Sequence, residues 1–364
     1  MSVPYRADAQ TVVASPRKNI TSVPIAERIC EVKDEWMKVG MIDCDAKNPK
    51  HIFPNLPLMK ISAWHKSKGD SVVWYDTFKA LSEGEYDKVY CSKVFSFSPD
   101  YDRPIYAKEI EYGGSGFAIS MVDGREVYDK QKDPSLPYEI EHHFPDYSLY
   151  GITDTAYGFI SRGCPRGCSF CHVKDMQGLT AHRVARLSEF WNGQPNIVLL
   201  DPNITACLEW KEIFQELIDS GAMIDFSQGL DIRMMTEAKA EMLKQIKVKD
   251  VHFAWDRYED KDNVLPRLKA FKDISQWDRR KIIVYTLVGD RERRVTETDL
   301  EKIYTLRELG AYPYVMIYDK QSLPKGHELR KLQRWVNNRF VWEAVHTFDE
   351  YKENFNKEKE ANAG

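Results

Sequence analysis

The chain carries three cysteines within one short segment, Gly163-Cys164-Pro165-Arg166-Gly167-Cys168-Ser169-Phe170-Cys171-His172, which sets a Cys-x3-Cys-x2-Cys spacing. Cysteine thiolates are the usual ligands of iron-sulfur clusters, and a cubic cluster usually takes four of them. A single loop that offers three thiolates can therefore hold a cube in which one iron has no protein ligand. The spacing predicts an iron-sulfur site that is open to a small molecule.

This loop resembles that of the radical S-adenosylmethionine (radical SAM) superfamily, which reads Cys-x3-Cys-x-aromatic-Cys and has Phe170 here in the aromatic position. The resemblance implies an enzyme whose 4Fe-4S cluster is held by Cys164, Cys168 and Cys171, with Phe170 beside the cofactor. It also implies that S-adenosylmethionine chelates the free iron, that an external electron donor reduces the cluster, and that cleavage yields a 5′-deoxyadenosyl radical. The radical would abstract hydrogen from a substrate, a small molecule or a macromolecule, which the sequence does not identify.

The same cysteines admit two other interpretations. The segment from Cys168 to His172 also fits the Cys-x-x-Cys-His pattern of c-type haem attachment, and the three cysteines with His172 could form a Cys3His zinc site. Haem attachment leaves Cys164 without a role, and structural zinc sites usually join two separated ligand pairs. The alternative function from a different class is therefore a non-catalytic, metal-stapled module that binds nucleic acid.

Length and composition indicate an ordinary globular protein. The chain has 364 residues, of which 43% are hydrophobic and 30% are charged, and this length favours two domains over one. The formal net charge of -4 gives no overall field that would favour nucleic acid or an anionic membrane. No apolar run reaches membrane-spanning length, and the N-terminus lacks a signal-peptide pattern. We expect a cytoplasmic protein without a membrane partner, in which the seven cysteines are thiols or metal ligands.

Downstream of the cysteine loop, short apolar runs alternate with amphipathic stretches, which predicts repeated βα units and a parallel sheet. We expect six strands, at 157–161, 196–200, 223–227, 250–254, 281–288 and 312–317. We expect helices at 183–191, 208–219, 237–247, 264–271 and 297–309. Six units are too few to close an eight-stranded barrel, and they match the open (β/α)6 partial TIM-type barrel of the radical SAM family.

Polar residues follow each predicted strand, at the end where parallel α/β barrels carry their chemistry. The resemblance places the methionyl amino group of the cofactor at the end of the second strand, beside Asp201 and Asn203. Capping of the following helix by Asn203 or Thr205 is the structural alternative. After the third strand, Gln228, Asp231 and Arg233 suit the ribose hydroxyls and the methionyl carboxylate, whereas a weak surface pair of Asp231 with Arg233 is the alternative. The later loops carry residues better placed for substrate, namely Asp256, Arg257, Asp290, Arg291 and Asp319.

Upstream, we expect strands at 38–43, 71–75 and 88–91 and a helix at 58–68, which together suggest a Rossmann-like or flavodoxin-like domain. Such a domain before a barrel resembles the radical SAM proteins with a cobalamin-binding-type domain and the methylthiotransferases, and it implies methyl or methylthio transfer. The Asp-x-His-x-x-Gly segment that ligates cobalt in one class of cobalamin proteins is missing, because the chain reads Asp43-Cys44-Asp45-Ala46-Lys47-Asn48 after the first strand. Cobalamin held without a histidine ligand stays open as a cofactor.

These patterns divide the chain into five parts: an N-terminal extension at 1–34, a Rossmann-like domain at 35–130, a linker at 131–154, the radical SAM core at 155–320, and a C-terminal helix with a polar tail at 321–364. Within the second part, Gly113-Gly114-Ser115-Gly116 is not a dinucleotide fingerprint, because the strand-like run 117–122 follows it. We expect a tight hairpin turn there.

Two further features complete the sequence-based expectations. The segment 330–342 mixes cations with aromatic residues, which could hold RNA, but we prefer an amphipathic helix that packs Leu332, Trp335 and Val336 inward. Cys30, Cys44 and Cys91 form a second cysteine set, in which Cys44 and Cys91 each end a predicted strand and could be neighbours. Methylthiotransferases carry a three-cysteine cluster in this domain, but the spacings here differ, so buried thiols are favoured.

Overall fold

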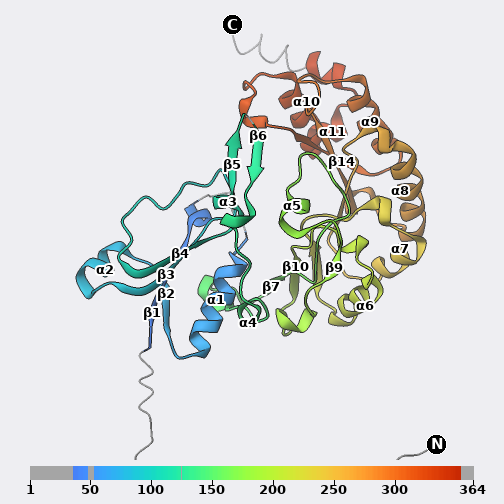
Figure 1. Ribbon diagram of the computed structural model, residues 1–364. Coiled ribbons are helices and arrows are strands. Elements are labelled where there is room, and N and C mark those ends of the chain that lie inside the picture. The colour runs from blue at the N-terminus through green and yellow to red at the C-terminus, as the bar shows by residue number, and fades with distance from the viewer. Residues whose placement is uncertain (1–35, 48–52, 124, 354–364) are drawn as a thin grey trace, which may run out of the picture. The chain divides into compact units, whose positions relative to one another are not determined.

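A computed structural model describes residues 36–47, 53–123 and 125–353. Every helix and strand considered below lies within the unit Met37–Gly364, and Figure 1 shows how these elements are arranged. Cys30 and the residues of the polar tail beyond 353 lie outside the described residues.

The first part of this unit is a four-stranded sheet in which all strands run parallel. Its strands are β1 (Lys38–Asp43), β2 (Ser71–Trp74), β3 (Tyr86–Ser92) and β4 (Ala107–Gly113), in the order β2-β1-β3-β4. Two helices lie between the strands in sequence, α1 (Leu56–Ser67) and α2 (Thr77–Glu83). The order matches the start of the flavodoxin-like arrangement, in which ligands bind at the carboxyl ends of the strands, between the first and third strands.

The sequence of β1 explains why this strand is central. Val39 and Met41 point to one face, where they pack with Leu58 of α1, and Ile42 points to the other face, where it packs with Tyr86. A strand that is apolar on both faces is typical of a buried parallel sheet. The helix α1 begins where Asn55 accepts a hydrogen bond from the backbone N–H of Leu58, as an N-cap residue does.

The hairpin expected at Gly113–Gly116 is wrong. The chain instead runs from β4 into the short helix α3 (Ser115–Ala118) and then β5 (Ile119–Val122), which pairs with β6 (Arg125–Tyr128). Gly114 has φ +101°, and a Cβ atom there would lie 2.3 Å from the carbonyl oxygen of Lys93. The glycine therefore allows the chain to pack closely on the loop after β3, a long-range contact that no local turn signal reveals. No element was expected at α2 or at β4; α2 is only seven residues long and β4 is mostly exposed, so neither shows a long apolar pattern.

The connecting segment after this sheet is ordered and tied to it. It contains α4 (Tyr138–Glu141) and a 3-10 helix, Tyr147–Tyr150. Ser62 of α1 donates a hydrogen bond to Asp146 at 2.6 Å, and the hydroxyl of Tyr150 donates one to Asp43 at 2.7 Å. These bonds fix the start of the next strand relative to the carboxyl end of β1.

The second part contains two three-stranded parallel sheets. One has the order β11-β10-β7, with β7 (Thr155–Gly158), β10 (Asn196–Leu199) and β11 (Met223–Phe226), and the other has the order β12-β13-β14, with β12 (Val251–Ala254), β13 (Ile282–Val288) and β14 (Tyr312–Ile317). A parallel bridge joins Ile224 to Val248, and the backbone N–H of Leu230 bonds the carbonyl of His252 at 2.7 Å. The two sheets therefore meet between β11 and β12. Five of the six predicted strands are confirmed, but the one expected at 157–161 is shifted, because β7 ends at Gly158 and Ser161–Arg162 forms a separate strand.

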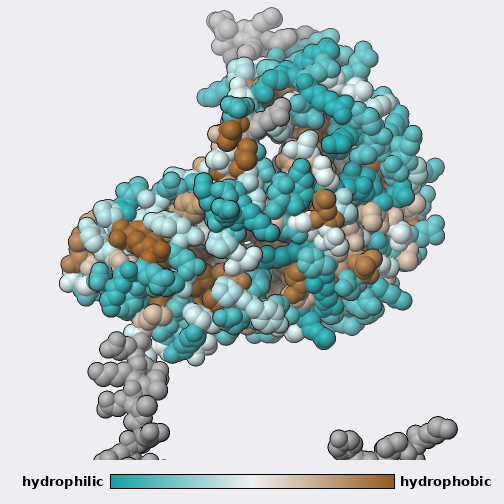
Figure 2. All heavy atoms as spheres, viewed as in Figure 1, coloured by the Kyte–Doolittle hydropathy of each residue, from teal (hydrophilic) through white to brown (hydrophobic). Residues whose placement is uncertain are grey.

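Four helices lie along one side of these sheets (Figure 1): α6 (Trp210–Ser220), α7 (Glu237–Leu243), α8 (Lys261–Ser275) and α9 (Glu297–Glu308). In α6 the apolar residues Ile213, Phe214 and Leu217 are buried against the sheet, and Gly221 ends the helix in the left-handed conformation, as C-terminal glycines commonly do. The surface over α7 to α9 is largely hydrophilic (Figure 2), as expected for amphipathic helices. No helix among the described residues is long and apolar enough to cross a bilayer.

The helix expected at 183–191 is also wrong. Residues His182–Arg183 form the strand β9, which pairs with β8 (Ser161–Arg162), and only Leu187–Glu189 form a 3-10 turn. The backbone N–H of Val184 bonds the carbonyl of Ile160 at 2.8 Å. Because these backbone groups pair with the segment that enters the cysteine loop, they are not available to a helix.

The C-terminal part packs as the preferred interpretation predicts. Helix α10 (Glu328–Asn337) buries Leu332, Trp335 and Val336, and helix α11 (Arg339–Ala344) buries Trp342. The indole N–H of Trp335 donates to the carbonyl of Val345 at 3.0 Å. Neither tryptophan can stack on a base, because both lie inside the protein.

Candidate functional site

The cysteine loop is held at both ends by backbone contacts. It follows β8 and precedes the short helix α5 (Val173–Gln177). The N–H of Gly163 bonds the side-chain oxygen of Gln177, and the N–H of Cys164 bonds the carbonyl of Gly178, both at 3.1 Å. Within the loop, the N–H of Cys171 bonds the carbonyl of Cys168 at 3.2 Å. The loop therefore closes on itself and presents its three thiols from one turn of chain.

The three cysteines are half-buried, and the charges that follow β11 and β12 act on Cys168. Burial raises the pKa of Cys168 and of Cys171. The charges of Arg233 and Arg257, which follow β11 and β12, act on Cys168 in the opposite direction. The carboxyl ends of these strands and the cysteine loop therefore face the same space.

Asn203, which follows β10, lies directly against the loop. Its Nδ2 is 3.3 Å from the Sγ of Cys164 and 3.4 Å from Oδ2 of Asp231, and its Oδ1 accepts a hydrogen bond from Thr205 at 2.8 Å. The side chain is buried and caps no helix. Asn203 therefore connects the first cysteine of the loop to the ends of two strands.

Asp231 is the centre of an ion-pair network below the loop. Its Oδ2 accepts from Nε of Arg166 and its Oδ1 from Nε of Arg233, both at 2.8 Å, and Arg233 also pairs with Asp260 at 2.8 Å. Burial would raise the pKa of Asp231, but the two guanidinium groups outweigh it and hold that pKa below its usual range. Because only 6% of the Asp231 side chain is exposed, this is not the weak surface pair that a solvated Asp-Arg contact would give.

Arg166 was given no role by the sequence, although it lies between the first two cysteines. Its bond to Asp231 joins the middle of the loop to the end of β11. In the sequence, Arg166 is recognisable only as a charged residue within the cysteine loop. This does not identify its partner Asp231, which lies 65 residues further along the chain.

Asp201 supports the segment that leads into the loop. Its carboxylate accepts hydrogen bonds from the backbone N–H groups of Ile160 and Ser161 and, at 2.7 Å, from the hydroxyl of Ser161. The side chain is buried, and burial raises the pKa of Asp201 to about 6 in spite of these donors. Asp201 therefore holds the turn between β7 and β8 in place through these hydrogen bonds.

The raised pKa of Asp201 predicts a specific pH dependence of stability. Because the native carboxyl binds its proton more tightly than the unfolded one, its stabilising contribution is complete below the unfolded pKa of 3.8 and is lost as the pH rises through about 6. A shift of this size corresponds to roughly 3 kcal/mol. We expect D201N to remove this part of the pH dependence, measured by urea unfolding at intervals from pH 4 to 7.

The control for this prediction is D219N, because Asp219 lies exposed on α6, where it accepts a hydrogen bond from Gln215. We expect D219N to keep the pH slope of the wild type. An unchanged slope in D201N would contradict the assignment.

The remaining predicted site residues lie at the same strand ends but differ in their contacts. Gln228 is exposed and its side chain donates to Ser227 at 3.5 Å, and Phe170 is half-buried in the loop. The later loops show Asp256 bonded to the backbone of Leu287, Arg291 paired with Glu259 and Asp319 paired with Arg293, while Asp290 is exposed. Arg257 is exposed and makes no ion pair with any described residue.

The described residues contain no group of three His, Cys, Asp or Glu side chains that converges on a single metal ion. His172 instead lies 3.3 Å from the carboxylate of Glu126. A zinc ion binds its thiolates at about 2.3 Å and so gathers them tightly, whereas a cube spreads its ligands over separate iron atoms. Three thiolates from one loop equal in number the protein ligands of a cubic cluster whose fourth iron has no protein ligand.

No family model and no curated protein matches the sequence. Among solved structures, the fold is similar to that of the radical S-adenosylmethionine methyltransferase TsrM from Kitasatospora setae. A structure of TsrM with cobalamin and a [4Fe-4S] cluster bound matches at a TM-score of 0.51 and 11% identity, over 78% of this chain and 75% of that chain. A structure of TsrM with tryptophan substrate and an S-adenosylmethionine analogue bound matches at a TM-score of 0.52 and 12% identity, over 77% and 72% of the two chains. At such low identity the likeness establishes the fold, which resembles that of this group of radical SAM proteins.

Proposed function

We propose that this chain is a radical SAM enzyme that holds a 4Fe-4S cluster on Cys164, Cys168 and Cys171. The observation that carries the proposal is the position of the cysteine loop, whose first thiol lies against Asn203 and whose arginine bonds Asp231 at the carboxyl ends of β10 and β11. The likeness to the TsrM fold supports the same conclusion. When bound, the reduced cluster would supply the electron that cleaves S-adenosylmethionine to a 5′-deoxyadenosyl radical.

In this proposal, the two three-stranded parallel sheets are the two halves of one catalytic domain. We propose that their six strands form an open (β/α)6 partial barrel at 155–320, preceded by a Rossmann-like domain at 35–130 and the connecting segment 131–154. The shared edge between β11 and β12 supports this assignment. The free thiols of the described cysteines and the oxygen sensitivity of such a cluster fit a reducing, cytoplasmic location.

The chain's own residues would orient the cluster ligands. The amide N–H of Asn203 points at the sulfur of Cys164, and hydrogen bonds to cluster sulfurs tune the reduction potential. The ion pair of Arg166 with Asp231 fixes the loop between its first two cysteines. Asp201 would act as a positioning residue below the loop, since its carboxylate is already occupied by Ile160 and Ser161.

Arg257 is the best candidate to receive the carboxylate of S-adenosylmethionine. Arg233, which the sequence favours for this role, already pairs with Asp231 and Asp260, whereas Arg257 makes no ion pair with a described residue and acts on the charge of Cys168. We expect R257Q to raise the KM for S-adenosylmethionine about 10-fold, corresponding to about 1.4 kcal/mol for a charge-assisted hydrogen bond.

The measurement is the rate of 5′-deoxyadenosine formation against cofactor concentration, with the iron content of each variant determined first. R280Q is the matched control, because Arg280 precedes the opposite end of β13 and pairs with exposed Asp278. An unchanged KM in R257Q at full iron content would rule out this contact.

Cobalamin does not fit the cavity that this structure offers in the N-terminal sheet. The pocket at the ends of β1 and β2 measures about 160 Å³, below the usual range of small-molecule sites, which begins at about 300 Å³. Its walls would enclose only a fragment of a corrinoid, so no step is assigned to cobalamin. Methyl or methylthio transfer to an unknown substrate is proposed only on the likeness of architecture.

The proposed function is tested by anaerobic reconstitution of the full chain with iron and sulfide. We expect a broad absorption near 400 nm, by analogy with other cysteine-ligated clusters, and release of 5′-deoxyadenosine from S-adenosylmethionine when dithionite serves as the electron donor. A chain that binds zinc, stays colourless and releases no 5′-deoxyadenosine would instead support the metal-stapled binding module.

A further inference from the structure

Two cysteines outside the proposed cluster site lie next to each other. Cys44 follows β1 directly, and Cys91 lies in β3, where it pairs in register with Ile42. Their sulfur atoms are 3.6 Å apart. Both side chains are buried, with 3% and 1% exposed. The parallel pairing of β1 with β3 therefore produces a dithiol at the carboxyl edge of the sheet.

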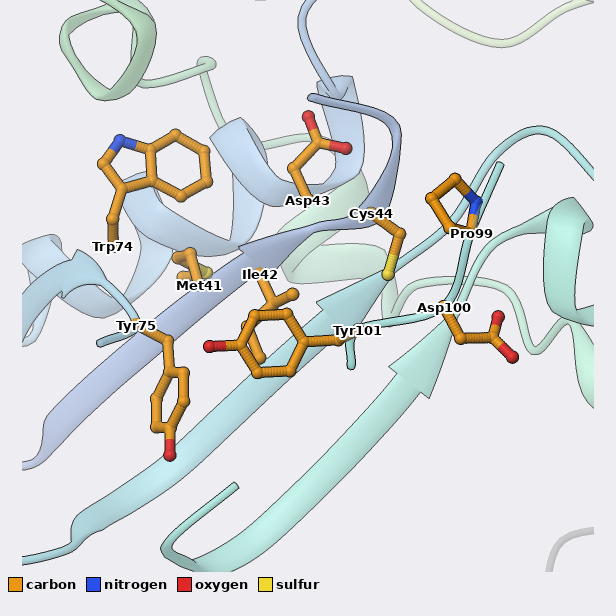
Figure 3. Close-up of a pocket in the computed structure, with 9 residues that line it drawn as sticks. All are labelled: Met41, Ile42, Asp43, Cys44, Trp74, Tyr75, Pro99, Asp100 and Tyr101. Carbon is orange, nitrogen blue, oxygen red and sulfur yellow. The ribbon is translucent and has the colours of Figure 1, made fainter. Parts of the chain in front are cut away.

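A pocket gives one member of this pair access to small molecules. Cys44 is among the residues that line it, together with Asp43, Trp74 and Asp100 (Figure 3). The pocket volume is about 160 Å³, similar to the cavity of about 150 Å³ that admits benzene in another protein. A molecule of the size of hydrogen peroxide can enter it, whereas a folded protein cannot.

The pocket assigns the two thiols different roles, because Cys44 lines it and Cys91 is not among its lining residues. The contact between the two sulfur atoms, in which either thiol can be the donor, lowers the pKa of Cys44, although burial and the carboxylates of Asp45 and Asp100 oppose it. The same contact raises the pKa of Cys91, which also faces the carboxylate of Asp43. A pocket-lining cysteine with a second thiol beside it is an arrangement in which oxidation can end in a reversible disulfide.

We propose that Cys44 and Cys91 form a peroxide-reactive dithiol in the N-terminal sheet, which is oxidised to a disulfide and is separate from the cluster cysteines. The supporting geometry is the 3.6 Å sulfur separation and the pocket that reaches Cys44. This activity does not depend on the proposed radical chemistry.

The reaction balances with a small hydroperoxide as the oxidant. The Cys44 thiolate attacks one peroxide oxygen, the O–O bond breaks, and the departing oxygen leaves as water after it takes a proton. The sulfur of Cys91 then attacks the sulfenic acid of Cys44 and releases a second water. Two thiols and one hydrogen peroxide thus give one disulfide and two waters.

Closing the bond requires a local movement at the end of β1. The separation must fall from 3.6 Å to about 2.05 Å. Cys44 begins the 3-10 helix Cys44–Lys47, so this helix, and not the paired strand, can supply the shift. Asp43 lies beside it and accepts the bond from Tyr150. Oxidation should therefore alter the environment of Trp74, which lines the same pocket.

The test uses the full, reconstituted chain and equimolar hydrogen peroxide, followed by alkylation of free thiols and peptide mass spectrometry. We expect a peptide pair linked through Cys44 and Cys91 that dithiothreitol separates, with a reversible change in tryptophan fluorescence. Cys207 is the internal control, because it is buried and bonded to Glu209 with no thiol beside it among the described residues, and it should remain open to alkylation after unfolding.

Two variants separate the roles of the thiols, after circular dichroism has confirmed that each is folded. In C91S we expect Cys44 to stop at the sulfenic acid, which dimedone traps, and in C44S we expect Cys91 to stay reduced. The proposal is overturned if both cysteines remain fully alkylated after peroxide treatment, if Cys44 links to a different cysteine, or if the C44S/C91S variant binds less iron, which would make the pair a metal site.

Discussion

Replacing Cys168 by alanine is expected to abolish formation of 5′-deoxyadenosine. Without Cys168, only two thiols of the loop remain as ligands, and a second iron of the cube loses its protein ligand. Even residues that only support metal ligands typically contribute 10-fold to 100-fold in affinity or activity. We therefore expect C168A to lose activity by about 100-fold or more, with loss of the absorption near 400 nm and of most bound iron and sulfide. The equivalent variants of Cys164 and Cys171 should behave in the same way.

The matched control is C207A. Cys207 follows β10, as Asn203 does, and is buried, but its thiol bonds Glu209 at 3.1 Å and does not approach the loop. Removing it deletes one buried sulfur without touching the cluster ligands, so iron content and activity should stay near those of the wild type. If C168A retained a full cluster, a ligand outside this loop would have to hold it, and the proposed function would fail.

The sequence was sufficient for features that depend on local pattern. The downstream strands followed from short apolar runs, because that signal lies within a few residues, whereas the role of the cysteine loop as a cluster site stays a prediction. The expectation that Cys44 and Cys91 could be neighbours is also confirmed, at 3.6 Å between their sulfur atoms. It needed only that two parallel strands end at the same edge of a sheet.

Features that depend on distant partners could not be predicted. Residues 183–191 have a helical period, but the backbone around Val184 pairs with Ile160 instead, so tertiary pairing overrides the local pattern. The same limit applies to Asp201, which has the residue type and position expected of a cofactor contact and nevertheless accepts three bonds from Ile160 and Ser161. Residue type at a strand end identifies the site but not the partner of each side chain.

The glycines of the cysteine loop show the difference between a pattern and a structural requirement. From the sequence, Gly163 and Gly167 both bracket the loop and both could be needed for its turns. In the structure only Gly163 has a positive φ, +87°, and a Cβ atom there would lie 2.1 Å from the carbonyl oxygen of Thr180. At Gly167 an added Cβ would meet nothing within 4 Å.

We therefore expect G163A to lose the cluster and G167A to keep it. The left-handed conformation alone costs a residue with a side chain about 1–2 kcal/mol, and the contact with the Thr180 carbonyl cannot be relieved without moving the backbone that precedes Cys164. Retention of iron that is about 5-fold to 30-fold weaker follows from this range. The measurement is iron per chain after anaerobic gel filtration, with circular dichroism to show that both variants are folded. Equal iron in the two variants would mean that the loop adopts another conformation when the cluster is bound, because only the conformation described here distinguishes one glycine from the other.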